Sequence, residues 1–205
     1  MHTFASRLIF TLLLAPPAFA ASSMDLAVRG SITPNACEPL IGGEGTIDYG
    51  KMSFATLNPD HHTALPAQTM PISVRCEGPT FFTLTTIDNR AGTSANHEHW
   101  HGLGLTPDGE KIGGAAFHLH NAVADGAPAH LIVSWDGGMS WAPDNILSSA
   151  TLTAISASNT DLVPAAVKDL DADIGVLTHL VPTDRITLTD EVPLDGYATV
   201  QLSYL

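Results

Sequence analysis

Basic residues are scarce in this 205-residue sequence. Eight Lys and Arg stand against 21 Asp and Glu, which gives a formal net charge of −13 at pH 7. A surface with this excess of negative charge repels nucleic acid and anionic lipid and favours solubility. The composition therefore argues against a nucleic-acid partner.

Long apolar runs are missing as well. The most apolar stretch, residues 8–14, is shorter than the roughly 20 residues that a membrane-spanning helix needs. It follows a short segment with one Arg and precedes Ala18-Phe19-Ala20, an A-x-A cleavage pattern. We therefore expect residues 1–20 to be a signal peptide of the Sec pathway. The mature chain, residues 21–205, is then expected to be a single domain without a transmembrane segment.

Cysteine is limited to Cys37 and Cys76. An exported chain reaches an oxidising compartment, where two cysteines are more economically explained as one disulfide than as free thiols. Closing this loop is expected to stabilise the fold by roughly 2–4 kcal/mol, mainly by restricting the unfolded chain.

Helical periodicity is nearly absent, whereas short alternating runs separated by Gly, Pro, Asn and Asp recur throughout. This pattern predicts an all-β antiparallel sandwich. A turn is expected at residues 77–80, and one short helix over residues 163–170 with Pro164 near its start. The predicted strands include residues 26–32, 72–76, 82–84, 117–120, 131–135, 185–189 and 197–205.

Most catalytic motifs are lacking: there is no G-x-S-x-G elbow, P-loop or dinucleotide fingerprint. Residues 97–101, HEHWH, match the zinc-peptidase pattern H-E-x-x-H, which requires a helix to bring its two histidines together. Gly92 and Gly102 flank the motif and leave no helix of useful length. We therefore expect no catalytic residue and no cofactor, with a zinc metallopeptidase as a disfavoured alternative.

The same stretch keeps a metal-binding alternative open. In an extended segment His97, His99 and His101 would point to one face, about 6.6 Å apart in steps of two residues. Neutral imidazoles with this spacing ligate zinc, copper or nickel. The competing interpretation is an exposed, solvated loop, and the pair His118 and His120 is expected to occupy the polar face of its strand.

Several segments of the sequence resemble the pilin-like subunits of chaperone–usher fimbriae. LAVRGSITPNAC (26–37) is similar to a first pilin strand leading to the first half-cystine. MPISVRCEG (70–78) places Cys76 at the second. Another of the next strands is similar to GTIDYGKMSF (45–54). A proteobacterial fimbrial-like group of unassigned function is resembled by three further stretches, GLGLTPDGEKIGG, SWDGGMSW and LDGYATVQLSYL. The resemblance implies an Ig-like antiparallel β-sandwich with one disulfide and a structural or adhesive role at the cell surface.

The C-terminal segment carries the most informative part of this resemblance. Ala198, Val200, Leu202 and Tyr204 alternate on one face, and Gly196 lies just upstream. In pilins such a strand is captured by a periplasmic chaperone, because a sandwich that lacks one strand exposes core side chains and unpaired backbone groups. Alternation alone is equally compatible with an ordinary last core strand.

The implied partners are a periplasmic pilus chaperone, an outer-membrane usher and other fimbrial subunits. Only residues 21–25 would precede the first strand, and five residues span at most about 17 Å. We therefore expect a subunit that accepts a strand but cannot donate one, or a self-complemented monomer. An exported zinc- or copper-binding protein and a carbohydrate-binding sandwich remain alternatives.

Overall fold

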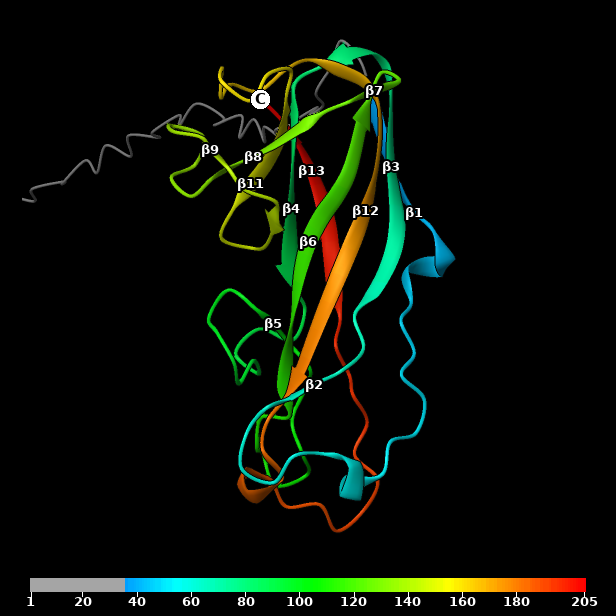
Figure 1. Cartoon of the computed structure of the whole chain (residues 1–205), viewed down its shortest axis with the longest axis vertical. Coiled ribbons are helices and arrows are strands. Elements are labelled where there is room, and N and C mark those ends of the chain that lie inside the picture. Colours follow the sequence, from blue (N-terminus) through cyan, green and yellow to red (C-terminus); the bar gives the residue numbers. More distant parts are fainter. Residues whose placement is uncertain (1–35) are drawn as a thin grey trace, which may run out of the picture. The chain divides into compact units, whose positions relative to one another are not determined.

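The computed structural model describes residues 36–205. The signal peptide predicted for residues 1–20 and the strand expected over residues 26–32 lie outside the described residues. Within residues 36–205, strands make up nearly all regular structure and form two antiparallel sheets (Figure 1). The predicted all-β sandwich is confirmed.

The larger sheet has eight strands, and its main path runs in the order β1-β3-β12-β6-β10. Two short strands, β5 and β7, pair with β6, and β2 pairs with β12. The strands are β1 (Cys37–Ile41), β2 (Thr63–Ala64), β3 (Gln68–Thr80), β5 (His101–Gly102), β6 (Gly113–Ala124), β7 (Ala127–Pro128), β10 (Ile146–Leu147) and β12 (Val167–Leu180).

The smaller sheet has five strands in the order β13-β4-β11-β8-β9. In Figure 1 the long strands β6 and β12 of the larger sheet face the viewer, and β4 and β13 lie behind them. The strands are β4 (Phe82–Asp88), β8 (His130–Ser134), β9 (Ala142–Pro143), β11 (Leu152–Ser156) and β13 (Ala198–Tyr204).

The core lies between the two sheets and is built by alternation along the strands. On β12, the side chains of Leu170, Ala172 and Ile174 are buried, whereas those of Asp171 and Asp173 between them are exposed or half-buried. Alternate side chains of a strand point to opposite faces, so one face of each long strand supplies the apolar layer. The smaller sheet contributes Phe82 and Leu84 from β4.

A disulfide joins Cys37 and Cys76, as predicted, with a Cα–Cα distance of 3.9 Å. The two cysteines are direct register partners in the antiparallel pair of β1 and β3. The disulfide therefore links β1, the edge strand of the larger sheet, to its neighbour.

Three sequence predictions are wrong. Residues 167–170 begin β12 and not a helix, because the segment pairs with β3 and β6. Residues 185–189 form no strand, since the 3-10 helix η3 (Thr183–Arg185) leads into coil there. The turn expected at residues 77–80 lies inside β3, which continues to Thr80 before the chain enters β4.

The helical content is limited to single turns among the described residues: η1 (Gly43–Gly45), η2 (Phe54–Thr56) and η3. None of the helices within residues 36–205 has the length and apolar character needed to span a membrane.

Candidate functional site

The C-terminal strand β13 lies at one edge of the smaller sheet. It pairs with β4 over its whole length, from Ala198 opposite Asp88 to Tyr204 opposite Phe82. No other described strand pairs with it. Within residues 36–205, one side of β13 is therefore an open edge.

Backbone geometry defines which groups face this open edge. The amide of Asn89 donates to the Tyr197 carbonyl, and the amide of Leu205 donates to the Phe81 carbonyl. In an antiparallel pair, residues bond to the partner strand alternately. The odd-numbered residues of β13 therefore bond to β4, and the N–H and C=O groups of Ala198, Val200, Leu202 and Tyr204 point to the open edge.

The side chains of the first three of these residues face the interior. Ala198, Val200 and Leu202 are half-buried, whereas Thr199 and Gln201 between them are exposed. The alternation predicted for this strand is confirmed for these three residues. Tyr204 is 43% exposed, and its hydroxyl accepts a hydrogen bond from the Cys37 amide at 3.0 Å.

An apolar groove opens beside the start of β13, with a volume of about 230 Å³. Its floor is the inner face of the larger sheet, and its walls are β13 with the residues before it and the coil that follows β1. The main apolar lining residues are Ile41, Ile47, Tyr49, Met70, Leu103, Phe117, Leu147, Ile174, Val176, Leu194 and Val200. Many of them are only partly buried although they pack against the core.

The groove continues into a neighbouring hollow of about 480 Å³, because Ile47, Tyr49 and Leu194 line both. The two wall segments are coil over most of their length. The opening is thus long and apolar, and it is bordered by an edge of β13 with which no strand of the described residues pairs.

Specific contacts hold the chain before β13 in place. The Arg90 guanidinium bonds both carboxylate oxygens of Asp195 and keeps the pKa of that carboxyl below its usual value. The Asp195 amide donates to the Leu103 carbonyl at 3.0 Å. A Cβ on Gly196 would lie 2.9 Å from the Leu103 side chain, so glycine permits this close approach.

His101 is a buried polar residue in the groove lining. It is 2% exposed, its Nε2 lies 2.8 Å from the Thr86 hydroxyl, and its ring packs against Phe117. Its Nδ1 has no hydrogen-bond partner among the described residues. Burial lowers the pKa of His101, although the Asp88 carboxylate and the Ala115 backbone act in the opposite direction.

The HEHWH stretch does not form the arrangement considered from the sequence. His97 and His99 lie in a surface turn with their ring centroids 5.0 Å apart, whereas His101 belongs to β5 and points into the protein. Among residues 36–205, no three His, Cys, Asp or Glu side chains lie close enough together to hold a metal ion. The three candidate ligands are therefore not brought together.

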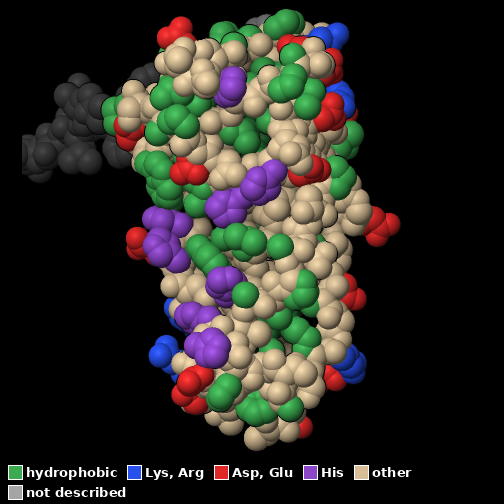
Figure 2. Space-filling model, viewed as in Figure 1, with side chains coloured by type: hydrophobic (Ala, Val, Ile, Leu, Met, Phe, Trp, Pro, Cys, Tyr) green, Lys and Arg blue, Asp and Glu red, His purple; other side chains and the backbone are tan. Residues whose placement is uncertain are grey.

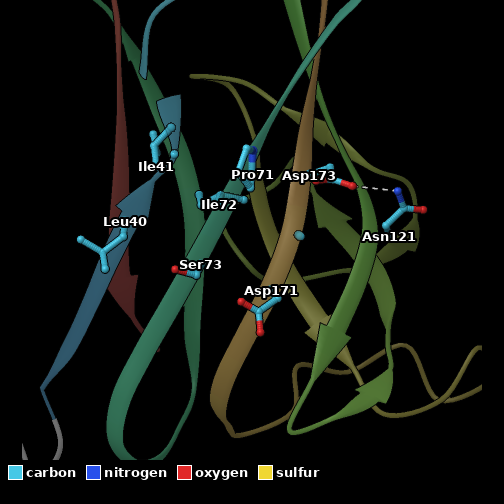
Figure 3. A pocket seen from close by; sticks show the side chains of 10 residues that line it. Leu40, Ile41, Pro71, Ile72, Ser73, Asn121, Asp171 and Asp173 are labelled. Atoms are coloured by element: carbon cyan, nitrogen blue, oxygen red, sulfur yellow. Dashed lines mark hydrogen bonds between the residues drawn. The ribbon is translucent and has the colours of Figure 1, made fainter. Parts of the chain in front are cut away.

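A third hollow, of about 470 Å³, lies on the outer face of the larger sheet over β1, β3, β12 and β6 (Figure 3). Its two carboxylates already have partners. Asp173 accepts from the Asn121 amide at 2.8 Å, and Asp171 pairs with Arg75. This hollow has no unpaired charged group to direct a ligand.

The sequence predicted the strand that borders the groove but not the coil segments of its walls. Ile47, Tyr49 and Leu194 belong to coil, where no periodic pattern marks an inward-facing residue. The segment of residues 45–54, singled out by its resemblance to pilin strands, contains two of these three residues but forms no strand here.

Comparisons with known proteins find one family model that matches part of the chain and relatives that align with nearly all of it. Residues 26–101 match the model of the family described as "Protein of unknown function (DUF1120)". The chain is 27% identical to Protein GltF of Escherichia coli (strain K12) over 240 aligned residues, which cover 94% of each chain. It is 24% identical to the uncharacterized protein YhcF of the same organism, with 95% of this chain and 98% of that protein covered.

Proposed function

We propose that this protein is an exported structural or adhesive subunit of the fimbrial type, which acts by accepting a β-strand from another protein. The observation that carries the proposal is the open edge of β13 beside an apolar groove. An added strand would bond to the outward-facing backbone groups of β13 and place alternate side chains in the groove. This is the physical basis of strand addition as a mode of recognition.

The occupant to which the proposal commits is an extended segment of another chain with apolar residues at every second position. Such a segment matches the apolar lining, because its inward side chains would cover partly buried core residues such as Ile47 and Met70. A pilus chaperone would supply the segment in the periplasm, and an usher and neighbouring subunits would follow at the cell surface. The role is one of assembly and not of catalysis.

Physical chemistry supports an occupant of this kind. An unpaired strand edge next to exposed core side chains promotes aggregation, so proteins cover or blunt such edges. A chain with net charge −13 also favours a partner with basic groups around the contact.

Co-expression of the chain with and without a pilus chaperone tests the proposal, with soluble yield and co-purification as readouts. Val200→Asp should abolish co-purification, because it would place a carboxylate on the groove side of β13, where an unpaired charge is costly to bury. Thr199→Asp, one residue away on the exposed face, is the matched control and should leave the complex intact.

Equal recovery of the Val200→Asp and wild-type complexes would contradict the proposal. So would a soluble monomer obtained in equal yield without a chaperone. Circular dichroism of the Val200→Asp chain separates lost binding from lost folding.

A further inference from the structure

Accessible histidines gather on the face of the molecule formed by β6 and β12, as Figure 2 shows. Every histidine of residues 36–205 except His101 is at least partly exposed. Imidazole is a good ligand for zinc, copper and nickel. Two pairs lie close enough to act together: His97 with His99, and His118 with His120.

The first pair is already engaged within the protein. Nδ1 of His97 accepts a hydrogen bond from the His99 amide at 3.2 Å. The His99 ring packs against Trp135 with a centroid distance of 5.0 Å, and its Nε2 lies 3.6 Å from the Glu98 carboxylate. These contacts engage Nδ1 of His97 and Nε2 of His99 within the surface turn.

The second pair has a different geometry. His118 and His120 are two residues apart on β6, so both side chains stand on the outer face of the larger sheet. Their ring centroids are 6.3 Å apart. Nδ1 of His118 lies 3.3 Å from Oδ1 of Asn145, and Nδ1 of His120 lies 3.3 Å from Nδ2 of the same side-chain amide. Two imidazole nitrogens therefore converge on the space that a single small polar group occupies.

The sheet itself positions the His120 ring. Gly175 on β12 is the register partner of His118, and a Cβ built on it would lie 2.8 Å from Nε2 of His120. The ring thus rests against the β12 backbone where a side chain is missing. Any larger residue at position 175 would push the ring away.

We propose that His118 and His120 together bind one Cu²⁺ ion, which takes the position now held by the Asn145 amide. Copper is the divalent first-row metal that nitrogen ligands bind most tightly. The net charge of −13 favours the approach of a cation. This site lies on the outer face of the larger sheet and the groove on the inner face, so the two proposals are independent.

Isothermal titration of untagged mature protein with Cu²⁺ at neutral pH tests the site. One ion per chain is expected, with electron paramagnetic resonance showing nitrogen coupling from two imidazoles. His118→Ala and His120→Ala should each weaken binding about tenfold or more, because each removes one of two ligands. The control His97→Ala/His99→Ala should leave the affinity unchanged.

Two further variants probe the geometry. Asn145→His adds a third imidazole at the point of convergence and should tighten Cu²⁺ binding about tenfold or more. Gly175→Ala should weaken it by displacing the His120 ring. The assignment would be overturned if the wild-type protein bound no Cu²⁺. It would also be overturned by unchanged affinity in the His118→Ala or His120→Ala variant, or by affinity in Asn145→His no higher than in the wild-type protein.

Discussion

His101 shows how one side chain connects the core with the groove. Its Nε2 makes a hydrogen bond to Thr86 on β4, and its ring packs on Phe117 of β6, so the residue bridges the two sheets. Protonation would place a charge in this apolar environment. Burial therefore favours the neutral ring and lowers the pKa of His101.

The lowered pKa predicts a loss of stability in acid. The unfolded chain takes up a proton near the ordinary histidine pKa of 6.5, before the folded chain does. The free energy of unfolding should therefore be fully present above that pH and fall as the pH drops through the lower folded pKa. His101→Gln removes the titrating ring and should flatten this part of the profile. Urea unfolding of the wild-type and His101→Gln proteins at pH values from 7.5 to 5 measures how the free energy of unfolding depends on pH. Parallel profiles for the two proteins would contradict the prediction.

Side-chain and backbone contacts at position 101 could not be predicted from the sequence. The HEHWH motif drew attention to His101 as a metal ligand, whereas the two-residue strand β5 turns this side chain inward and leaves His97 and His99 outside. Local spacing does not show where so short a strand will pair. The convergence of His118 and His120 on Asn145 depends on β10 pairing with β6, which is equally non-local.

At the scale of elements, local alternation was the reliable signal. It predicted the inward-facing residues of β3, such as Ile72 and Val74, and the half-buried residues of β13. The start of β12 was nevertheless predicted as a helix, although its buried residues alternate with three outward-facing aspartates, Asp169, Asp171 and Asp173. Strand formation there comes from pairing with β3 and β6 and not from intrinsic preference.

The edge strand β1 provides a prediction at this scale. It has five residues and pairs only with β3 among the described strands. The Cys37–Cys76 disulfide links it covalently to that neighbour. Replacing both cysteines by serine should lower the free energy of unfolding by about 2–4 kcal/mol. Denaturant unfolding of the variant and of the oxidised wild-type protein measures the difference. Equal stability would show that the disulfide does not restrain the unfolded chain.

At the scale of the whole molecule, the two sheets differ in how completely they close the sandwich. The larger sheet covers its side of the core with long strands, whereas the smaller sheet ends at β13 next to an apolar groove. Among residues 36–205, β13 has β4 as its one paired neighbour, and the proposed assembly role follows from this feature. The fold class was evident from the sequence, but this opening was not, because its second wall is coil.

Residue-resolved hydrogen exchange on β13 tests the central claim most directly. The chain is compared alone and in complex with a pilus chaperone. In the isolated chain the amides of Ala198, Val200, Leu202 and Tyr204 should exchange fast, because they face the open edge, and those of Thr199, Gln201 and Ser203 should be protected by β4. Complex formation should slow the first set selectively. Protection of both sets in the isolated monomer would show that the edge is already paired and would contradict the account.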